Sequence, residues 1–436
     1  MASSTVPVLE LPALCAARGT VALPGSKSIS NRTLLLAALS EGTTTLSGLL
    51  AADDTARMLD ALATLGIRIV HDPDAGTARV EGRSGSFPVK QADLFLGNAG
   101  TAFRPLTAVL AMLGGDYRLR GVPRMHERPI LDLVDTLHAA GCEVSYESVR
   151  GYPPLHITGS GGQAGSPLGI RGDVSSQFLS ALLMALPLAH GADRHATPVD
   201  VTTPLISRPY VDITTNLMRR FGVSVEMPGA DTFVVPAGAR YRAPGSLAVE
   251  GDASSASYFL AAGVLGGGPV RVMGVGRDSI QGDVAFADVL AQQGGDLRFG
   301  PDWIEARQGA RLRGGVVDCT AIPDAAMTLA MTALFAAAPT RVTGIGSWRV
   351  KETNRIAAMA LELAKLGATV RAGDDWLEVE PLASFTHAAI DTYDDHRMAM
   401  CFALAAFGGA GVTIRDPACV RKTFPEFFAV FGSITR

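Results

Sequence analysis

The chain has 436 residues, of which 47% are apolar and 18% are charged, and it contains 48 glycines. This length exceeds one ordinary hydrophobic core, so we expect two domains, and the composition is typical of a well-buried α/β protein. The formal net charge of −4, with no basic tail and no run of lysine and arginine, argues against nucleic acid as the main partner.

The first predicted elements are a short strand, a tight turn and an apolar helix. Residues 20–23 are of β type, a Pro-Gly pair breaks the strand, and residues 26–39 predict a helix that is apolar on almost every side. Such a turn exposes unpaired backbone N–H groups at the positive end of a helix dipole. Because Lys27, Ser28 and Arg32 add two cations and a hydroxyl, this turn is predicted to bind an anion.

Two series of markers recur along the chain at spacings of 70 to 81 residues. Polar turns open apolar helical runs at Ser28, Thr101, Ser176, Ser255, Ala325 and His396. Glycines that precede short β-type segments close helical stretches at Gly66, Gly141, Gly222, Gly295 and Gly367. Because the two series run in step, the sequence predicts six repeats. The Pro/Gly-rich residues 236–245 fall between the third and fourth repeats and are the predicted domain boundary.

Each predicted repeat has a polar turn, an apolar helix, a strand, an amphipathic helix, a glycine and a further strand. The amphipathic helices are predicted at residues 53–65, 130–140, 211–221, 283–293 and 355–366. Helices without a polar face are expected inside, with strands and amphipathic helices around them. Three such helices per domain would gather their positive N-termini at one end, and two facing domains would form an anion trap. The alternative is that the repeats are architectural and that the turn residues only cap helices.

The second turn carries small and polar side chains at a predicted helix start. Gly100 lets the backbone approach a ligand, and Asn98 can cap the helix or donate a hydrogen bond. Arg128, further along this repeat, must be extended because a proline follows it. Taken alone, these residues are as typical of a helix cap as of a site.

The third and fourth turns, residues 172–177 and 251–256, are near-copies of one another. Gln177 adds an amide side chain where the fourth turn has an alanine, so a binding function is favoured for the third turn. Ser207 and Tyr210 follow it in a segment that could also be plain loop.

The fifth turn and the segment after it combine carboxylates with cations. Asp324 lies at a predicted helix start, where capping is the plain alternative. Lys351 and Arg355 lie near the start of the next predicted helix, with Glu352 between them. Cations are unfavourable at a helix N-terminus, so a bound anion is indicated, whereas a solvated, salt-bridged helix start is the alternative. In the sixth turn an Asp-His pair lacks any metal-ligand spacing, so no metal site is expected.

The cysteines and apolar runs predict a cytoplasmic protein. Five scattered cysteines without metal-ligand spacing favour reduced thiols over a disulfide framework. Residues 1–10 lack a basic region followed by an apolar core, so no signal peptide is expected. The longest apolar runs, such as residues 178–189, are shorter than a membrane span, and no membrane partner is expected.

A series of motifs spans nearly the whole chain, in this order: LPGSKSISNR, GNAGTAFRPL, RMHERPI, GDVSSQFLSALLMALP, SRPYVDIT, EGDASSASYFLAA, IPDAAMT, WRVKETNR, DDHRMAM and KTFPEFF. Together they resemble the 5-enolpyruvylshikimate-3-phosphate (EPSP) synthase family. The resemblance implies an α/β fold of two similar domains, each with three βαβαββ-type units around buried apolar helices, and an active site in the interdomain cleft. It implies one domain at residues 25–248 and a discontinuous one at residues 1–24 and 249–436.

The family transfers the enolpyruvyl group of phosphoenolpyruvate to the 5-hydroxyl of shikimate 3-phosphate, through a tetrahedral ketal and with release of phosphate, in the shikimate pathway to chorismate and aromatic amino acids. The resemblance implies these two small-molecule partners, no cofactor and no metal, and we expect a monomer. The residues that match the shikimate 3-phosphate site are Lys27, Ser28, Arg32, Ser175, Ser176, Gln177, Ser207, Tyr210, Asp324, Ser347 and Lys351. Those that match the phosphoenolpyruvate site are Lys27, Asn98, Gly100, Arg128, Gln177, Arg355, Arg397 and Lys422. The catalytic matches are Asp324, Glu352 and Lys27.

The chemistry of the reaction agrees with these residue types. Two phosphates and two carboxylates demand several cations, and arginine forks suit both groups. The attacking hydroxyl must lose a proton, which suits a carboxylate base at Asp324. The methylene carbon must gain and then lose a proton, and the resemblance implies Glu352 for this role. The sequence does not decide whether Glu352 or Lys27 delivers the proton.

Two positions depart from the family pattern, and two others match one form of it. Ser347 stands where the family more often has asparagine, and Asn354 stands where aspartate is commoner, beside Arg355. Gly100 and Pro105 match the glyphosate-sensitive form, which implies inhibition competitive with phosphoenolpyruvate.

The sequence disfavours three alternatives to this function. The sibling enolpyruvyl transferase for UDP-N-acetylglucosamine uses a catalytic cysteine in a loop between the second and third turns. In this chain the cysteine between those turns is Cys142. It lies at the end of a predicted helix, where a buried structural thiol is favoured. A non-catalytic phosphosugar-binding or scaffold protein would not need Asp324 and Glu352 beside the cations. A P-loop kinase is disfavoured because the GSKS turn lacks the GxxxxGK[ST] spacing.

Overall fold

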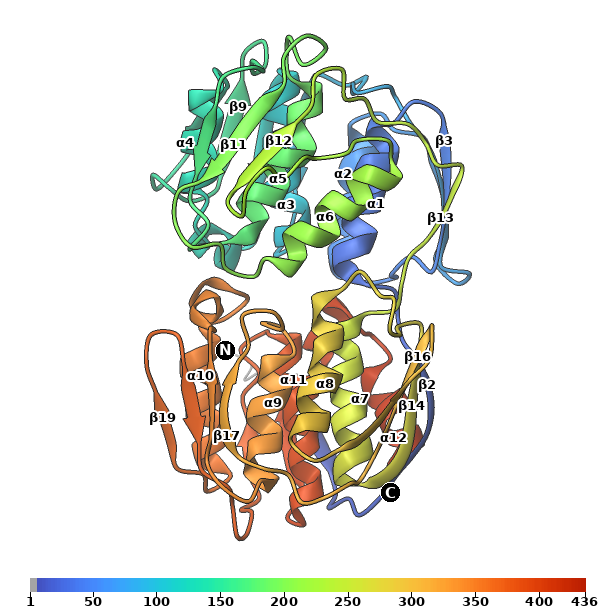
Figure 1. Cartoon of the computed structure of the whole chain (residues 1–436), viewed down its shortest axis with the longest axis vertical. Coiled ribbons are helices and arrows are strands. Elements are labelled where there is room, and N and C mark those ends of the chain that lie inside the picture. The colour runs from blue at the N-terminus through green and yellow to red at the C-terminus, as the bar shows by residue number, and fades with distance from the viewer. Residues whose placement is uncertain (1–5) are drawn as a thin grey trace, which may run out of the picture. The chain divides into compact units, whose positions relative to one another are not determined.

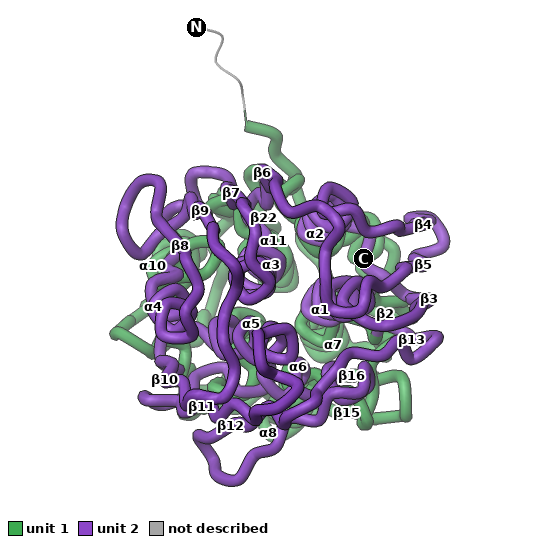
Figure 2. The backbone as a smooth tube through the Cα atoms, turned by 90° about the horizontal axis from the view of Figure 1, so that it is seen from above, with its two compact units in different colours: residues 1–24, 250–436 green, residues 25–249 purple. Residues whose placement is uncertain are grey.

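A computed structural model describes residues 6–436, which form two compact units (Figure 2). Unit 1 contains residues 250–436 together with the N-terminal segment up to Pro24, and unit 2 contains Gly25–Val249. Residues 1–5 of the predicted segment 1–24 lie outside the described residues. The predicted boundary at residues 236–245 is too early, because the strand after it, Ser246–Ala248, pairs with Thr43–Ser47 inside unit 2.

The helices of unit 2 are α1 (Lys27–Leu39), α2 (Asp53–Thr64), α3 (Gly100–Leu113), α4 (Leu131–Ala139), α5 (Ser176–Ala185) and α6 (Pro209–Arg220). Its strands are β3 (Thr43–Ser47), β4 (Ile69–Asp72), β5 (Thr77–Glu81), β6 (Gln91–Phe95), β7 (Asp116–Arg120), β8 (Glu143–Tyr146), β9 (Leu155–Thr158), β10 (Leu168–Ile170), β11 (Thr197–Val201), β12 (Thr232–Val235) and β13 (Ser246–Ala248). They form sheets of order β13-β3-β5-β4, β6-β7-β9-β8 and β10-β11-β12.

The helices of unit 1 are α7 (Ala253–Leu265), α8 (Ala285–Gln292), α9 (Ala326–Thr332), α10 (Arg355–Lys365), α11 (His396–Phe402) and α12 (Phe427–Ile434). Its strands are β1 (Val8–Leu11), β2 (Ala17–Ala22), β14 (Gly267–Met273), β15 (Asp296–Phe299), β16 (Trp303–Arg307), β17 (Gly315–Asp318), β18 (Thr340–Thr343), β19 (Val370–Ala372), β20 (Leu377–Val379), β21 (Ala389–Ile390) and β22 (Val412–Arg415). They form sheets of order β15-β16-β14-β2, β17-β18-β20-β19 and β1-β22-β21.

The repeats share one pairing pattern. In the second repeat, β6 pairs in parallel with β7 across the apolar helix α3, and β7 and β8 each pair antiparallel with β9. In the fifth repeat, β17, β18, β19 and β20 pair in the same way around α9. A parallel pair requires a crossover connection, and the apolar helix supplies it.

The first and fourth repeats exchange their first strands. β2 precedes α1 in the chain but pairs in parallel with β14, and β13 precedes α7 but pairs in parallel with β3. The sheet of unit 1 that contains β14 is therefore completed by the N-terminal segment of the chain.

The apolar helices lie at the predicted positions and are buried, so the prediction of their character is confirmed (Figure 1). Every residue of α9 and α11 is buried, whereas Ser28 in α1 and Gln177 in α5 are partly exposed in the first turn of their helices. The predicted amphipathic helices are found as α2, α4, α6, α8 and α10. Their bounds differ from the predicted ones by at most two residues; at α8, for example, residues 282–284 form a 3₁₀ turn and the helix begins only at Ala285.

No helix within residues 6–436 is both long enough and apolar enough to cross a membrane.

Candidate functional site

The N-terminal parts of the three apolar helices of unit 1 meet, as predicted for helices entered from equivalent turns. Figure 1 shows α7, α9 and α11 side by side. Ser257 of α7 and Thr328 of α9 share a hydrogen bond of 2.7 Å between their hydroxyls. The Tyr258 hydroxyl of α7 accepts a hydrogen bond of 3.2 Å from Arg397 Nη1 of α11.

Asp324, two residues before α9, lies within reach of three cations. Its Oδ1 is 3.1 Å from Arg355 Nη1 and 3.4 Å from Lys351 Nζ, and its Oδ2 is 2.9 Å from Arg397 Nη2. Burial acts to raise the pKa of Asp324, but the charges of Arg397, Lys351 and Arg355 outweigh it and hold that pKa well below its usual value. Unit 1 therefore places three of the predicted site residues, Lys351, Arg355 and Arg397, around the Asp324 carboxylate.

Arg355, the first residue of α10, is buried among three carboxylates. Its Nε and Nη2 donate to the two oxygens of Asp395 at 2.7 and 3.1 Å, and its Nη2 also donates to Glu352 Oε2 at 2.9 Å. Burial acts to lower the pKa of Arg355, but the charges of Asp395, Glu352 and Asp324 raise it well above its usual value. This network places Glu352 and Asp324 on the same guanidinium.

The two residues that depart from the family pattern, Asn354 and Ser347, lie in different surroundings. Asn354 caps α10, its Oδ1 accepting from Ala357 N at 3.3 Å, while Asp395 and Glu352 orient Arg355 without its help. Ser347 is buried, and its hydroxyl has no hydrogen-bond partner among the described residues, so it can serve a ligand. Its neighbour Trp348 fixes that loop, since Nε1 donates to Pro323 O at 2.7 Å.

Lys422 is the last residue of the 3₁₀ turn Pro417–Lys422, which packs against α11. It is buried, like Arg397 on the neighbouring helix. The predicted site residues of unit 1 thus come from the starts of α9, α10 and α11 and from this turn.

In unit 2, the first turn of α1 is tied to α2 and α3. Lys27 Nζ lies 3.7 Å from Asp54 Oδ2 on α2. Asn31 Nδ2 donates to Thr101 Oγ1 on α3 at 2.7 Å. These bonds hold the Lys27 turn beside the start of α3.

Arg32 joins the same turn to α5 and α6. Its Nε donates to Thr214 Oγ1 on α6 at 2.7 Å, and Thr214 donates to Ser180 Oγ on α5 at 3.0 Å. Its Nη1 donates to Ser28 O at 2.9 Å and its Nη2 to Tyr210 O at 3.4 Å. Burial lowers the pKa of Arg32 to about 10, which leaves it cationic at neutral pH.

Arg128 lies against the turn before α3. Its Nη1 donates to the side-chain and backbone oxygens of Asn98 at 3.1 and 3.2 Å. A Cβ on Gly100 would lie 2.9 Å from Arg128 Nη2 and 2.8 Å from Arg104 Nη1, so only glycine lets both guanidinium groups stay in place. Asn98, Gly100 and Arg128 are thereby brought together.

The remaining predicted residues of unit 2 lie at the starts of α5 and α6. Ser175 caps α5 and accepts from Gln177 N at 3.3 Å, and Ser176 is the first helical residue. Ser207 is buried with a positive φ of 53° two residues before α6, and Tyr210 reaches Arg32 through its carbonyl oxygen.

Sequence reasoning missed three residues that orient the predicted ones. Asp395, the aspartate of the Asp-His pair in the sixth turn, orients Arg355 and caps α11 by accepting from Arg397 N at 3.0 Å. Asp54 and Tyr258 were not singled out, yet they contact Lys27 and Arg397. The Asp-Asp pairs at residues 53–54 and 394–395, each at a helix start, are the sequence signal that could have identified Asp54 and Asp395. Nothing in the sequence distinguishes Tyr258 from an ordinary core residue.

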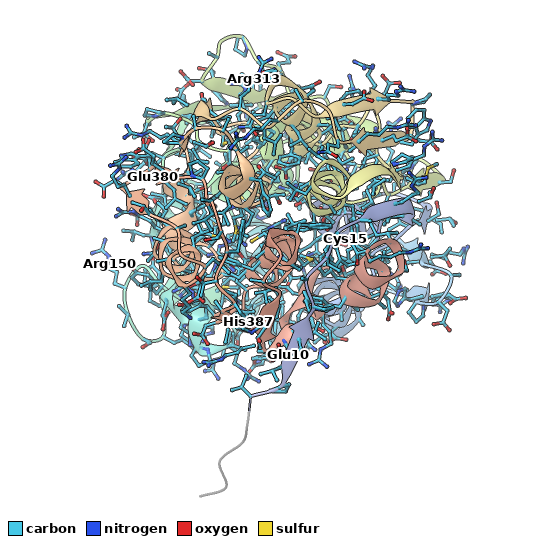
Figure 3. All side chains as sticks on the ribbon, turned by 90° about the horizontal axis from the view of Figure 1, so that it is seen from below. Glu10, Cys15, Arg150, Arg313, Glu380 and His387 are labelled. Atoms are coloured by element: carbon cyan, nitrogen blue, oxygen red, sulfur yellow. The ribbon has the colours of Figure 1, made fainter. Side chains whose placement is uncertain are left out.

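Within residues 6–436 there is no group of three or more histidine, cysteine, aspartate and glutamate side chains arranged to hold a metal ion. His387 lies near the N-terminal strand, with Nε2 3.9 Å from Glu10 Oε2 (Figure 3). His396 is fully buried at the start of α11, with its Nδ1 3.5 Å from Asp395 Oδ1.

Comparison with known proteins gives one consistent result. A family model described as EPSP synthase (3-phosphoshikimate 1-carboxyvinyltransferase) matches residues 15–431. Proteins named 3-phosphoshikimate 1-carboxyvinyltransferase from Bordetella petrii and Ralstonia nicotianae are each 60% identical over 98% of this chain and 97% and 99% of their own lengths. A 2.37 Å structure of EPSP synthase from Acinetobacter baumannii matches with a TM-score of 0.80 at 27% identity over 98% of both chains. The enolpyruvyl transferase NikO from Streptomyces tendae shares the fold, with a TM-score of 0.73 at 18% identity over 99% of both chains.

Proposed function

We propose a function that follows from family membership, because the chain belongs to the EPSP synthase family. It transfers the enolpyruvyl group of phosphoenolpyruvate to the 5-hydroxyl of shikimate 3-phosphate and releases phosphate. This is the 3-phosphoshikimate 1-carboxyvinyltransferase reaction of the shikimate pathway.

The observation that carries the proposal is the carboxylate–cation cluster of unit 1. Asp324 and Glu352 bind the same guanidinium, that of Arg355, while Lys351 and Arg397 also reach Asp324. Both substrates are polyanions whose reaction moves two protons, and such chemistry requires carboxylates set among cations. A protein that only bound a phosphosugar would need the cations alone.

In the proposed mechanism, Asp324 accepts the proton of the 5-hydroxyl as its oxygen bonds to C2 of phosphoenolpyruvate. A proton is delivered to C3, by Glu352 or by Lys27, and the tetrahedral ketal forms. The C2–O bond to phosphate then breaks as C3 returns its proton, which restores the double bond and releases phosphate. Lys27 and the arginines stabilise the negative charge of the ketal and of the departing phosphate.

The pKa of Asp324 explains how it becomes a base only when substrate is present. Without substrate, three cations hold that pKa well below its usual value, and so weak a base is a poor proton acceptor. When substrate anions share Arg397 and Lys351, the cations stabilise the Asp324 carboxylate less, and its proton affinity rises. The free protein thus uses Asp324 as a counter-ion and the substrate complex uses it as a base.

We assign the predicted site residues at the helix starts of unit 2 to anion binding in the same reaction. Arg32 is a buried cation held by side chains of α5 and α6, and the partly exposed Ser28 and Gln177 stand in the first turns of otherwise buried helices. Helix N-termini with hydroxyl and amide groups bind phosphate well. Ser175, Ser176, Ser207 and Tyr210 are assigned to shikimate 3-phosphate, and Asn98, Gly100 and Arg128 to phosphoenolpyruvate.

The test is phosphate release from phosphoenolpyruvate with shikimate 3-phosphate as acceptor and, separately, with UDP-N-acetylglucosamine. We expect release with the first acceptor only. Release with the second alone would assign the sibling activity, and release with neither would favour a binding protein. One chain supplies every residue assigned here, so we propose that the monomer is sufficient for activity. Sedimentation at the assay concentration tests whether the protein is a monomer.

The burial of the Cys142 thiol supports shikimate 3-phosphate, rather than UDP-N-acetylglucosamine, as the acceptor. Burial raises the pKa of its thiol to about 12, and its Sγ lies 3.9 Å from Met112 Sδ in the core. A catalytic cysteine needs an accessible thiolate with a lowered pKa, so Cys142 is a structural residue.

A further inference from the structure

Asp283 lies beside the cluster of unit 1 but is not among the residues assigned to substrate. It is the middle residue of η3 (Gly282–Val284) and is only 6% exposed. The preceding Gln281 ties this turn to the start of α7, since its Oε1 accepts from Ala253 N at 3.2 Å and its Nε2 donates to Gly251 O at 2.7 Å. The position of Asp283 is therefore well defined.

The two oxygens of Asp283 are used by the first turns of two apolar helices. Ser254 Oγ, on α7, donates to Oδ2 at 2.5 Å. The backbone N–H of Ala325, the N-cap of α9, donates to Oδ1 at 3.4 Å. One buried carboxylate thus joins the starts of α7 and α9.

The bond to Ala325 bears directly on Asp324. The nitrogen of Ala325 belongs to the peptide group that starts at the Cα of Asp324, and a peptide group is planar and rigid. A shift of this nitrogen therefore moves the backbone of Asp324. The Asp324 side chain would move with it, and this side chain makes the 2.9 Å contact to Arg397 and the 3.1 Å contact to Arg355.

We propose that Asp283 is a positioning residue for the transferase reaction: it holds the Asp324–Ala325 peptide, and with it the Asp324 carboxylate, against Arg355 and Arg397. Asp283 acts through Asp324 and does not touch substrate. This inference rests on the proposed function, in which Asp324 is the base.

The charge of Asp283 provides a signature that a purely structural residue would lack. Its burial and the charge of Asp324 raise the pKa of Asp283 to about 6, while the hydrogen bond from Ser254 and the charge of Arg397 act to lower it. Ionised Asp283 in turn raises the proton affinity of Asp324, because like charges oppose ionisation. Protonation of Asp283 near pH 6 therefore weakens the base.

Other titratable groups lie on the elements packed around Asp283. Asp252, the N-cap of α7, acts to raise the pKa of Asp283. Tyr258 is the titratable residue of α7 and is bonded to Arg397, and Asp288, the charged residue of α8, is exposed. Burial, with smaller contributions from the charges of Asp318 and Asp283, raises the pKa of the Cys319 thiol to about 12, so this thiol is neutral near pH 6.

Two variants test the proposal. Asp283→Asn keeps the shape but removes the charge and one acceptor, and we expect kcat to fall about tenfold or more with KM for both substrates within about threefold, since misplacing a catalytic group by 1 Å costs up to about 10²-fold. The decline of kcat below pH 6 is expected to be weaker than in the wild type. Substrate phosphates titrate in the same range, so the informative quantity is the difference between the two proteins in the same assay.

Ser254→Ala gives an independent result if Asp283→Asn folds poorly. It removes the hydrogen bond that acts to lower the pKa of Asp283, so the acid limb of kcat is expected to move to higher pH. The matched control is Glu305→Gln, which alters a carboxylate of similar burial on β16 that pairs with Arg271 and Arg307, and it is expected to leave kcat and the pH profile unchanged.

The outcomes separate this inference from the proposed function. A wild-type protein without turnover overturns the function, and crystal structures of the wild type and Asp283→Asn then decide the positioning role by themselves. An Asp324 carboxylate that keeps its contacts in the variant structure overturns the inference, and so does a variant with wild-type kcat and pH profile. Displacement of Asp324 from Arg397 supports it.

Discussion

Asp324 and Arg355 show how single residues in this protein depend on their neighbours for their ionisation. The pKa of the aspartate is held low and that of the arginine is raised, because each ionised group favours the charged form of the other. Removing one partner from such a buried network leaves an unpaired charge, at a cost of about 3–5 kcal/mol. Substitutions that preserve shape and hydrogen bonding are therefore the informative ones.

Glu352→Gln is the cleanest test of the acid–base role. The amide keeps an oxygen that can accept from Arg355, so the fold is expected to survive, whereas proton transfer is lost. We expect kcat to fall by about 10²–10⁴-fold, the usual contribution of general acid–base catalysis, with smaller changes in KM. Phosphate release measures the effect, and full turnover by a folded variant would remove Glu352 from the mechanism.

Gly100→Ala tests the anion site around Arg128. The added Cβ would approach the guanidinium groups of Arg128 and Arg104 to less than 3.0 Å, so both must move. Loss of one charge-assisted hydrogen bond costs about 1.5–3 kcal/mol, and we expect KM for phosphoenolpyruvate to rise by about tenfold or more. We expect the same rise in Ki for glyphosate, which we predict to be a competitive inhibitor.

The matched control for this variant is Gly432→Ala, where a Cβ meets nothing within 4 Å. It lies in the helix α12, so we expect unchanged kinetics and a small gain in stability from helix propensity. A Gly100→Ala protein that bound glyphosate as tightly as the wild type would contradict the assignment of this turn.

Asp283 predicts a pH dependence of stability. Its pKa is raised from 3.8 to about 6 in the folded protein, so the folded state binds this proton more tightly than the unfolded state. The resulting stabilisation is complete below about pH 4 and is lost as the pH rises through about 6, a change on the order of 3 kcal/mol. Thermal melts should therefore show the wild type gaining stability relative to Asp283→Asn at pH 4.5 compared with pH 7.5. A difference that is the same at both pH values would contradict the assignment.

At the scale of elements, the apolar helices concentrate polar groups in their first turns. In α7, Asp252 caps the helix by accepting from Ser255 N at 2.9 Å, and in α5 Ser175 does the same for Gln177 N. Since the rest of each helix is buried against apolar side chains, the first turn is the part that can bind polar ligands. The architecture and the site thus use the same residues.

Asn354→Ala separates capping from catalysis in α10. Loss of the hydrogen bond to Ala357 N should lower the free energy of unfolding by about 1 kcal/mol. Because Asp395 and Glu352 orient Arg355, kcat should stay within about twofold of the wild type. Chemical denaturation and the phosphate assay measure the two quantities, and a tenfold loss of kcat would show that the cap also orients Arg355.

At the scale of the whole molecule, the exchange of β2 and β13 makes unit 1 depend on both ends of the chain. β2 completes the sheet of β14, and β1 (Val8–Leu11) pairs with β22. Near the other end, Cys15 N donates to Arg436 O at 2.7 Å. Unit 2, in contrast, is one continuous segment from Gly25 to Val249.

This difference predicts how fragments behave. Residues 25–249 expressed alone should fold and unfold cooperatively, since their sheets and core are complete. Residues 250–436 lack β1 and β2, which leaves the edges of β14 and β22 unpaired, so this fragment should aggregate or show no cooperative transition. Adding residues 6–24 as a peptide should restore the transition, and circular dichroism during heating measures each case. A stable 250–436 fragment would contradict the role of the exchanged strand.

The sequence by itself determined the helices and the repeat. A run such as 326–332 is apolar on every side and can only be stable inside, and the 3.6-residue period of α2 or α10 specifies one buried face. Both signals are local, so they can be read from a window of the chain. The motif pattern also selected Asp324, Glu352, Arg355 and Arg397, which the structure brings together.

The tertiary structure alone decided which distant groups meet. That β2 pairs with β14, or that Asp395 rather than Asn354 orients Arg355, depends on contacts between residues far apart in sequence. Asp283 is the plainest case, because its neighbours in the chain show only a helix start, while its partners Ser254 and Ala325 come from two other helices. Hydrophobic periodicity specifies which face of an element is buried, but the partner of a buried polar group is chosen only when the elements pack.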